Sequence, residues 1–319
     1  MKSKSFMLSK IPLILSALLV SAGLSLGAAA KKEAPPASTQ KAFDTPQLAA
    51  EALIQAAEAF DVAALKEILG PGSEDLVSSE DAVQDKNRAT EFVAKAKEKH
   101  SVEVDPKNAN SATLSIGPDD WPLPIPIVKR NGKWSFDSKA GHEEILLRRV
   151  GANELDAIAV CRGYVEAQQE YASEKHDGAT VNQFAQKIIS TPGKQDGLAW
   201  KNADGTWGGP VGETVAEALE QGYTDKSKPF HGYFFKVLKG QGPAAPLGEI
   251  DFVVGGAMIG GFALAAAPAE YGVTGVQTFI VSHNGIVYQK DMGPDPLKEF
   301  KSMTVYNPDK TWKATDDEW

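Results

Sequence analysis

Cysteine is almost absent from this chain, since Cys161 is the single cysteine among 319 residues. One cysteine excludes a disulfide framework, a zinc site built from cysteines and an iron–sulfur cluster. The H-E-x-x-H, G-x-S-x-G, Walker and EF-hand patterns are missing as well. These absences favour a non-enzymatic protein, and we expect neither a metal ligand set nor a cofactor.

Positive charge is also scarce. The chain has 33 Lys and Arg residues against 42 Asp and Glu residues, which gives a net charge of −9. Binding to nucleic acid needs a basic surface, because the phosphate backbone supplies most of the binding energy. We therefore expect no nucleic-acid partner.

The N-terminus has the pattern of a secretory signal peptide. Lys2, Lys4 and Lys10 precede an uncharged, mostly apolar run over residues 11–26, and small residues fill 27–30. The run is shorter than the ~20 residues of a membrane-spanning helix. Cleavage after Ala30 would change the net charge from −9 to −12, because residues 1–30 hold three lysines and no acidic residue. We expect export to the periplasm or the medium, with no retained membrane span.

Composition and turn signals divide the rest of the chain. The predicted segments are a flexible tether over 31–43, an N-terminal α+β domain over 44–138, a connecting helix or linker over 139–152, a C-terminal α+β domain over 153–312 and an acidic tail over 313–319.

In the N-terminal domain, helices are predicted to precede antiparallel hairpins. Thr45-Pro46 and Asp61 are helix-start signals, and a further polar helix is expected near 82–99. Apolar and polar residues then alternate, and Asn131-Gly132 predicts a tight hairpin, because both turn residues need a positive φ. This order resembles the small NTF2-like and cystatin-like domains, which implies a sheet that wraps around a cavity or, more commonly, around a filled core.

The C-terminal domain is predicted to place one long helix before a sheet. Asn153 is a candidate N-cap for a helix that lasts to about Lys175. Two short helices are expected at 184–189 and 215–219, with a loop over 190–209 between them. The expected strands are 233–238, 252–254, 258–267, 276–282 and 286–289, the last two joined by a hairpin at His283-Asn284-Gly285.

Several residues of this domain resemble the globular heads of type IV pilins and pseudopilins. They are Tyr164, Gln168 and Tyr171, then Gly232-Tyr233-Phe234-Phe235, Ala267-Pro268, Thr274-Gly275, Thr278-Phe279 and Asn284-Gly285. The resemblance implies a long helix packed on an antiparallel sheet. The chain departs from pilins at its N-terminus, where no retained apolar helix continues into residues 153–175.

A second resemblance covers the whole chain after the signal peptide. The motifs that carry it are Asp119-Asp120-Trp121-Pro122, Pro124-Ile125-Pro126, Asn153-Glu154-Leu155, Cys161-Arg162-Gly163-Tyr164, Ser190-Thr191-Pro192-Gly193-Lys194, His231-Gly232-Tyr233, Ile259-Gly260-Gly261-Phe262 and Pro268-Ala269-Glu270-Tyr271-Gly272. They resemble a family of secreted bacterial proteins named domain of unknown function 2950. The resemblance implies a compartment and no activity.

Two groups of residues form a candidate binding patch. Asp119 and Asp120 precede Trp121, and in an extended segment these neighbouring carboxylates would point to opposite faces rather than share a proton. The preferred interpretation is a turn that anchors Trp121 in the core, and the alternative is a turn with a helix-cap-like or calcium-like role. The second group is His231, Tyr233 and Tyr271, in which His231 precedes a strand in an aromatic setting. A structural role for His231, bonded to a fixed neighbour, is the simpler interpretation.

Cys161 lies on the apolar stripe of the predicted long helix. We expect a buried and inert thiol there rather than a nucleophile. The Gly-rich run Gly255–Gly261 lacks the spacing of a dinucleotide loop, and its glycines are expected to serve bends or close backbone contacts.

The sequence therefore favours a secreted, periplasmic or envelope-associated protein that acts through binding or assembly. Its partner would be a protein or a small ligand of the cell envelope. One alternative is a small-ligand-binding module with a pocket in the N-terminal domain or at the domain interface. Another is a hydrolase of unfamiliar type that uses His231.

Overall fold

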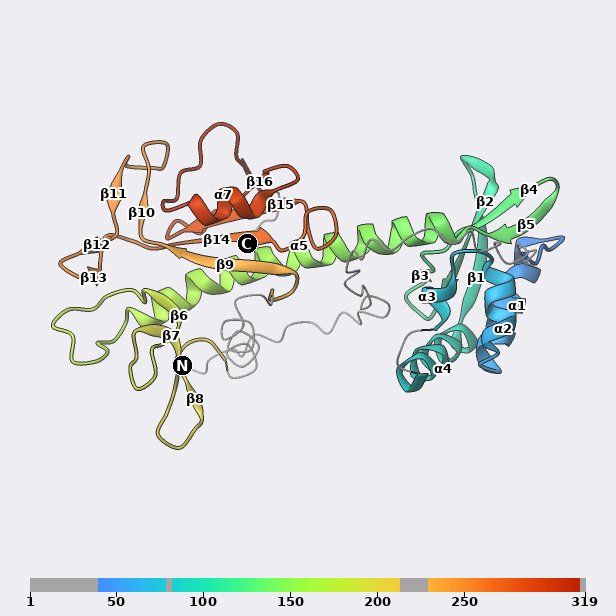
Figure 1. The fold of residues 1–319 in the computed structure, drawn as a ribbon, viewed down its shortest axis with the longest axis horizontal. Helices are drawn as coiled ribbons and strands as arrows, with labels where there is room; N and C mark the ends of the chain where they lie inside the picture. The colour runs from blue at the N-terminus through green and yellow to red at the C-terminus, as the bar shows by residue number, and fades with distance from the viewer. Residues whose placement is uncertain (1–39, 79–81, 213–228, 316–319) are drawn as a thin grey trace, which may run out of the picture. The chain divides into compact units, whose positions relative to one another are not determined.

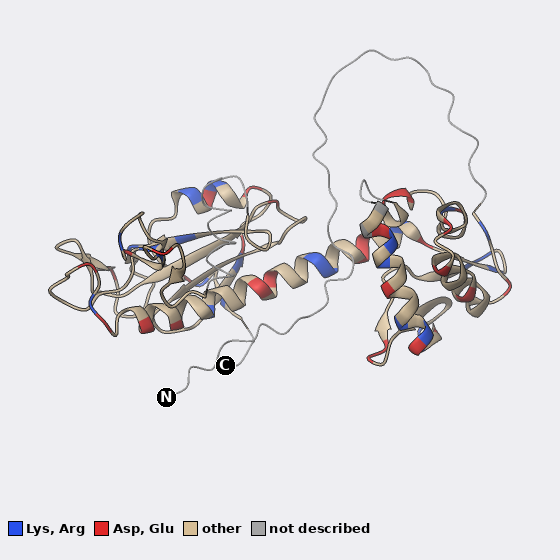
Figure 2. Ribbon diagram, turned by 90° about the horizontal axis from the view of Figure 1, so that it is seen from below, with Lys and Arg blue, Asp and Glu red and all other residues tan. Residues whose placement is uncertain are grey.

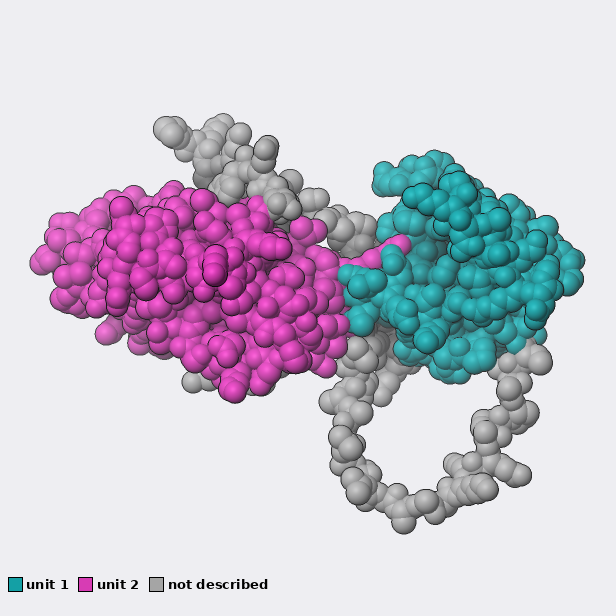
Figure 3. All heavy atoms as spheres, turned by 90° about the horizontal axis from the view of Figure 1, so that it is seen from above, with its two compact units in different colours: residues 1–147 teal, residues 148–319 magenta. Residues whose placement is uncertain are grey.

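The computed structural model describes residues 40–78, 82–212 and 229–315, and these residues form two compact units that divide between Leu147 and Arg148 (Figure 3). The signal peptide predicted at 1–30, most of the tether and the helix predicted at 215–219 lie outside the described residues. Both units combine helices with antiparallel sheet, so the fold class is α+β as predicted (Figure 1).

Unit 1 begins with helices that are capped as the sequence predicts. Thr45 Oγ1 accepts a hydrogen bond from Leu48 N at 3.2 Å, and Asp61 Oδ1 accepts one from Ala64 N at 3.0 Å. Gly70 ends the second helix with a φ of +85°. The helices are α1 (Pro46–Glu58), α2 (Val62–Leu69), α3 (Glu74–Val77) and α4 (Ala82–Glu98).

The sheet of unit 1 is antiparallel and has helices on one face. Its strands are β1 (His100–Asp105), β2 (Asn108–Ile116), β3 (Trp121–Pro122), β4 (Ile127–Arg130) and β5 (Lys133–Phe136), in the order β1-β2-β4-β5, with β3 also paired to β2. Ala112, Leu114 and Ile116 of β2 are buried, whereas Thr113 and Ser115 between them are half-buried. The buried set packs into one core with α1, α2 and α4.

The hairpin between β4 and β5 has the predicted tight turn. Asn131 and Gly132 have φ values of +51° and +81°, and Arg130 pairs with Lys133 across the turn. Residues 40–43, placed in the tether by the sequence, contact unit 1, because Lys41 N donates to Glu67 O and Phe43 pairs with Trp134.

Helix α5 (Ser138–Tyr171) is continuous through residue 153, so the prediction that Asn153 caps a helix is wrong. The Asn153 side chain instead donates from Nδ2 to Thr274 O at 2.9 Å. Acidic and basic residues alternate along the middle of this helix (Figure 2). The sequence there lacks the apolar periodicity from which a continuous helix is predicted. The helix also ends at Tyr171, one turn before the predicted end.

The main sheet of unit 2 is antiparallel, in the order β17-β16-β15-β14-β9. Its strands are β9 (Tyr233–Leu238), β14 (Ala263–Pro268), β15 (Gln277–Ser282), β16 (Tyr288–Asp291) and β17 (Lys313–Ala314). Helix α5 covers one face and α7 (Pro296–Ser302) covers the other (Figure 1). Residues 313–314 of the predicted tail thus belong to the sheet.

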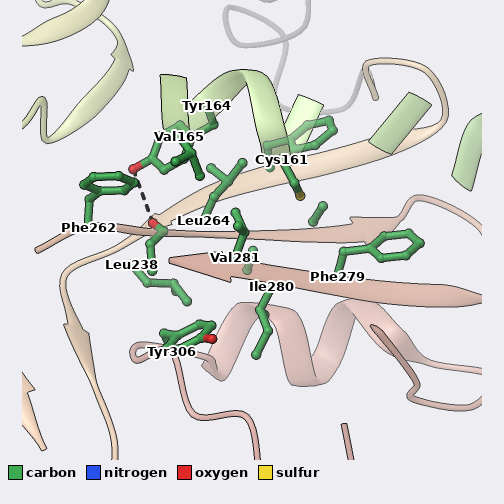
Figure 4. Packing of buried hydrophobic residues seen from close by; sticks show 14 of the residues in the cluster. Cys161, Tyr164, Val165, Leu238, Phe262, Leu264, Phe279, Ile280, Val281 and Tyr306 are labelled. Atoms are coloured by element: carbon green, nitrogen blue, oxygen red, sulfur yellow. Dashed lines mark hydrogen bonds between the residues drawn. The ribbon is translucent and has the colours of Figure 1, made fainter. Parts of the chain in front are cut away.

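Side chains from both layers meet the sheet (Figure 4). Cys161 and Val165 of α5 lie above Leu264 and Val281, while Tyr306 lies beneath with Ile280. Every residue of β14 is buried, as expected for a strand covered on both faces, and its alanines leave room for the helices.

Small strands complete unit 2. They are β6 (Lys187–Ile189), β7 (Gly197–Lys201), β8 (Trp207–Gly208), β10 (Gly240–Gln241), β11 (Ile250–Asp251), β12 (Val253–Val254) and β13 (Ala257–Met258). The helix predicted at 184–189 is therefore wrong, and the loop predicted at 190–209 contains two strands. Gly255 and Gly256, with φ values of +60° and +86°, form the two-residue turn between β12 and β13, as the Gly-rich bend predicts.

The segment before β6 is held by a buried amide rather than by helical bonds. Gln168 of α5 is fully buried, and its Nε2 donates to Tyr164 Oη at 2.9 Å and to Ala185 O at 2.8 Å. Its Oε1 accepts from Ala185 N at 2.8 Å. These bonds to Gln168 hold residue 185 against α5. The conformation of this segment therefore depends on tertiary contacts and not on the local sequence.

Candidate functional site

The six residues of the predicted binding patch fall in two units. Asp119, Asp120 and Trp121 belong to unit 1, and His231, Tyr233 and Tyr271 belong to unit 2.

The unit 1 group is a turn that places a tryptophan on the core. Residues 117–120 form a turn, in which Asp120 has a φ of +49°, and this confirms the turn that the sequence predicts before Trp121. Asp120 Oδ2 contacts Lys99 Nζ at 2.6 Å, and Asp119 is exposed. Trp121 is half-buried, pairs with Ile116 and packs against the core. The arrangement explains the motif as a structural turn.

The unit 2 group gathers at one end of the main sheet. Tyr233 opens β9 opposite Pro268, the last residue of β14. Tyr271 follows in the next loop, and its hydroxyl donates to Asp291 Oδ2, at the end of β16, at 3.0 Å. This bond raises the pKa of the Tyr271 hydroxyl. His231, Tyr233 and Tyr271 are thus neighbours of the same sheet end.

His231 contacts a carboxylate of α5. Its Nδ1 lies 2.6 Å from Asp156 Oδ2, with 48% of the histidine side chain and 32% of the aspartate side chain exposed. His231 has a φ of +47°, and Gly232 beside it has a φ of +75°. A Cβ on Gly232 would lie 2.6 Å from Asn153 Nδ2, so the chain passes this close only with glycine.

Other polar groups of α5 bind the adjacent loop. Glu154 Oε1 accepts from Val276 N at 2.8 Å and from Gln277 N at 3.0 Å. With Asn153 bonded to Thr274, these contacts fix α5 to the loop before β15. We call Asn153, Glu154, Asp156 and His231 the polar staple.

The hydroxyl groups near the polar staple are already engaged. Tyr233 is fully buried, its hydroxyl donates to Gln277 O at 2.9 Å, and burial together with the charge of Glu154 raises its pKa. Thr274 Oγ1 accepts from Glu270 N at 3.0 Å and donates to Glu270 O at 3.2 Å. Neither hydroxyl is placed as a nucleophile activated by His231.

A hollow of about 540 Å³ opens elsewhere in unit 2, between α5 and the loop that joins β15 to β16. Its lining residues are Arg162, Val165, Glu166, Gln169, His283, Asn284, Gly285, Ile286, Val287 and Thr315. The α5 residues recur at three- and four-residue spacing, so they form one face of the helix.

The loop side of the hollow is built by packing and local hydrogen bonds. Asn284 Oδ1 accepts from Ser282 Oγ at 3.1 Å and from Ile286 N at 3.2 Å. The His283 ring lies edge-on to the rings of Phe252 and Phe262, with centroids 6.2 Å and 6.3 Å away. These contacts fix the shape of the loop.

Gly261 makes the position of His283 possible. Its φ is +138°, and a Cβ there would lie 2.9 Å from the Phe252 ring and 3.1 Å from His283 Nδ1. The glycine permits both rings to pack over it, as the prediction of close backbone contact implies.

Sequence reasoning did not find this hollow. It treated His283-Asn284-Gly285 as a tight hairpin, but only Gly285 of the pair Asn284-Gly285 has a positive φ, and strand pairing ends at Ile280 and Tyr288. The wider loop leaves space beside α5. The available signal was the polar face of Arg162, Glu166 and Gln169 on a helix whose other face is buried.

Cys161, one residue before the hollow, is fully buried as predicted. Burial raises the pKa of its thiol to about 12, and the nearby Arg162 opposes only part of that rise. A thiol with that pKa is a poor nucleophile.

Among the residues that the structure describes, no three His, Cys, Asp or Glu side chains are grouped closely enough to hold a metal ion. No helix in the described ranges is both long and apolar enough to cross a membrane.

Residues 40–315 match the sequence model of a family described as "Protein of unknown function (DUF2950)", and the chain belongs to this family. The resemblance identified from short motifs is thereby confirmed. No curated protein and no solved structure matches the chain. The pilin-like, NTF2-like and cystatin-like resemblances are accordingly not confirmed.

Proposed function

We propose that this member of the DUF2950 family is an exported, non-enzymatic protein of the cell envelope that binds a small ligand in the hollow of unit 2. Export is supported by the charged, apolar and small-residue pattern of residues 1–30. Binding of a small ligand is supported chiefly by the hollow of unit 2.

The volume and the mixed lining of the hollow support a small-molecule site. Its volume of about 540 Å³ falls in the range of ligand pockets, roughly 300–1,000 Å³. The apolar lining residues are Val165, Ile286 and Val287, of which the two valines are almost fully buried, and the polar ones include Arg162, Gln169 and Asn284. Apolar area with a few polar groups is the usual composition of a binding pocket.

Catalysis is less well supported than binding. Glu166 is the one carboxylate among the lining residues, and it lies on α5, whereas His283 lies on the loop. The hydrolase hypothesis based on His231 lacks an activated nucleophile, because Tyr233 and Thr274 are bonded elsewhere. His231 and Asp156 are explained by their part in the polar staple.

Blocking the hollow tests the proposal. Gln169→Trp places a bulky side chain on its α5 wall, and Glu170→Trp is the matched control, because Glu170 is an exposed neighbour on the same helix and does not line the hollow. Ligand-observed NMR of the full chain against pools of amino acids, short peptides, sugars and small acids measures binding.

We expect hits that disappear with Gln169→Trp and persist with Glu170→Trp. Hits that survive Gln169→Trp would place the binding site elsewhere, and a screen without any hit would contradict the proposal. Export has its own test, since the intact mass of the recovered protein should lack residues 1–30.

A further inference from the structure

We propose that unit 1 pairs with a second copy of this chain through the outer edge of β1, so that the two copies form one continuous antiparallel sheet. The two edges of the unit 1 sheet differ. At β5, Phe43 bridges to Trp134, and the two residues exchange backbone hydrogen bonds of 2.8 Å. Within the described ranges β1 pairs only with β2, so its outer edge is open.

The backbone of β1 alternates between groups bonded to β2 and unused groups. Gly117 N donates to Lys99 O at 2.8 Å, so the backbone oxygen of Lys99 points towards β2. In an antiparallel pair this direction alternates from residue to residue, and Ser101 and Glu103 therefore point the same way as Lys99. The alternate residues, whose N–H and C=O groups point away from β2, are His100, Val102 and Val104. No backbone hydrogen bond within the described ranges ends on these groups.

β1 also lacks most of the features that protect an edge strand from pairing. Its sequence, His100–Asp105, contains no proline and no lysine, and none of its residues is buried. The register with β2 shifts only at its last step, between Val104 and Asp105, so residues 100–104 are regular. Val104 is 43% exposed on the sheet face that holds the core. An open strand edge with exposed apolar area is a site for pairing with another strand.

The sequence of β1 is self-complementary about a two-fold axis at Val102. Antiparallel pairing then sets Val102 opposite Val102 of the second copy and His100 opposite its Val104, so the unused backbone groups of both strands meet. Ser101 lies opposite Glu103 of the second copy. The two Glu103 carboxylates therefore do not face each other directly, which would be unfavourable.

The charges at the two ends of the paired strands also match. With the axis at Val102, Lys99 of each copy lies opposite Asp105 of the other, and opposite charges across a strand pair are favourable. Lys99 already contacts Asp120, but these side chains are 48% and 55% exposed, and an ammonium group has three donors. Asp105 Oδ1 accepts from Lys107 N at 2.8 Å, which leaves Oδ2 for this contact. This symmetric match favours a second copy over an unrelated extended peptide.

Sedimentation equilibrium of residues 31–319 measures the association. A single strand pair is smaller than a standard interface, so we expect a weak dimer with a Kd of roughly 1–100 μM. Val102→Pro removes the N–H at the axis but no bond to β2, so unit 1 should fold and the dimer should weaken at least about 100-fold. Val102→Thr is the matched control, because it keeps the N–H and the branched shape, and it should change the Kd less than about threefold.

Cysteine cross-linking tests the register, because the single native cysteine, Cys161, is fully buried. Hydrogen-bonded residues that pair across two strands have Cα atoms about 5.5 Å apart, which a disulfide spans. Val102→Cys should therefore cross-link two copies under mild oxidation. Val104→Cys is the matched control on the same face, since its two copies would lie about 13 Å apart along the strands, beyond the reach of a disulfide.

Charge reversal tests the strand ends. Lys99→Glu should weaken the dimer about tenfold, because it places two acidic residues opposite each other at both ends of the pair. Adding Asp105→Lys should restore the Kd to within about threefold of the original value, because the opposite charges then face each other again. A merely local effect on either residue would not give this rescue.

Three results would overturn the proposal. The first is a chain that stays monomeric up to about 1 mM, far above the expected Kd. The second is a dimer that Val102→Pro leaves unchanged, and the third is equal cross-linking of Val102→Cys and Val104→Cys, since either would place the contact outside this register. Should Val102→Pro unfold unit 1, the cross-linking pair decides between the outcomes.

Discussion

The sheet of unit 1 has helices on one face, whereas the sheet of unit 2 lies between α5 and α7 (Figures 1 and 4). Buried and half-buried residues alternate along β2. Along β14 all six residues are buried, four of them alanine. A strand with one covered face keeps a two-residue period in its sequence, and a strand covered on both faces loses it.

This difference decides how many positions of a strand accept a charge. In β2, Leu114 faces the helices and Thr113 faces away from them. In β14, Leu264 lies on the α5 face, and Ala265 lies on the opposite face, where its partner Lys236 donates to Phe300 O of α7.

Lysine substitutions give the largest expected effect. Leu264→Lys and Ala265→Lys should each lower the free energy of unfolding of unit 2 by ~4 kcal/mol or more, since both bury a charge. Leu114→Lys should do the same in unit 1, while Thr113→Lys should cost less than ~1 kcal/mol. Denaturant unfolding followed by hydrogen exchange measures each unit separately. Tolerance of Ala265→Lys would show that α7 does not cover the sheet.

The same contrast explains which elements the sequence could predict. The caps at Thr45 and Asp61 and the alternation in β2 are local signals, and all three are confirmed. The turn at Asn131-Gly132 is confirmed too. The similar pair Asn284-Gly285 forms a wider loop, because Asn284 Oδ1 bonds within the loop and His283 packs on Phe252 and Phe262.

Long-range contacts explain the errors in unit 2. Asn153 is a good capping residue, yet its partner is Thr274, 121 residues away. Residues 184–189 have helical spacing, but Gln168 holds Ala185 in an extended segment. Sequence reasoning placed His231, Tyr233 and Tyr271 in one group and missed the hollow, which depends on the width of one loop.

Substitutions at two glycines of unit 2 test the packing of Tyr233 and the open space beside α5. A Cβ at Gly275 would lie 2.1 Å from the Tyr233 hydroxyl, whose ring is fully buried and cannot move aside. Gly275→Ala should therefore cost ~1–3 kcal/mol. Gly163→Ala is the control of opposite sign, because α5 has open space there. It should stabilise by ~0.5–1 kcal/mol. Equal melting temperatures of the Gly275→Ala and Gly163→Ala variants would contradict this packing.

Labelling and substitution of Cys161 test whether its thiol is buried between α5 and the sheet. Its thiol should react with a maleimide slowly in native protein and fast in denaturant, and Cys161→Ser should cost ~1–3 kcal/mol, because it buries a hydroxyl. The folded pKa of about 12 exceeds the unfolded value of 9.0. The thiol therefore stabilises the fold below pH 9, and this contribution is lost as the pH rises from 9 towards 12.

Cys161→Ala should flatten the fall of stability across that pH range. It should not remove the fall entirely, because the pKa of Tyr171 is also raised from 10.0 to about 12. An unchanged pH profile, or fast labelling of the native protein, would place Cys161 nearer to solvent than the core that surrounds it.

Substitutions of His231 should give the smallest change in the free energy of unfolding. They also test whether the polar staple and the hollow of unit 2 are independent of each other. Its contact with Asp156 is partly exposed, and such pairs contribute roughly 0–1 kcal/mol. His231→Leu should therefore cost no more than ~1 kcal/mol. His231→Asn should cost less, because asparagine tolerates the left-handed backbone that His231 adopts at a φ of +47°.

A double-mutant cycle with His231→Asn and Asp156→Asn isolates the pair, and its coupling should stay below ~1 kcal/mol. Neither variant should change ligand binding in the hollow, because neither residue lines it. A coupling above ~2 kcal/mol would show that the His231–Asp156 pair contributes more to stability than a partly exposed pair is expected to contribute. Lost ligand binding in a well-folded His231→Asn variant would place the ligand site at the sheet end and not at Gln169.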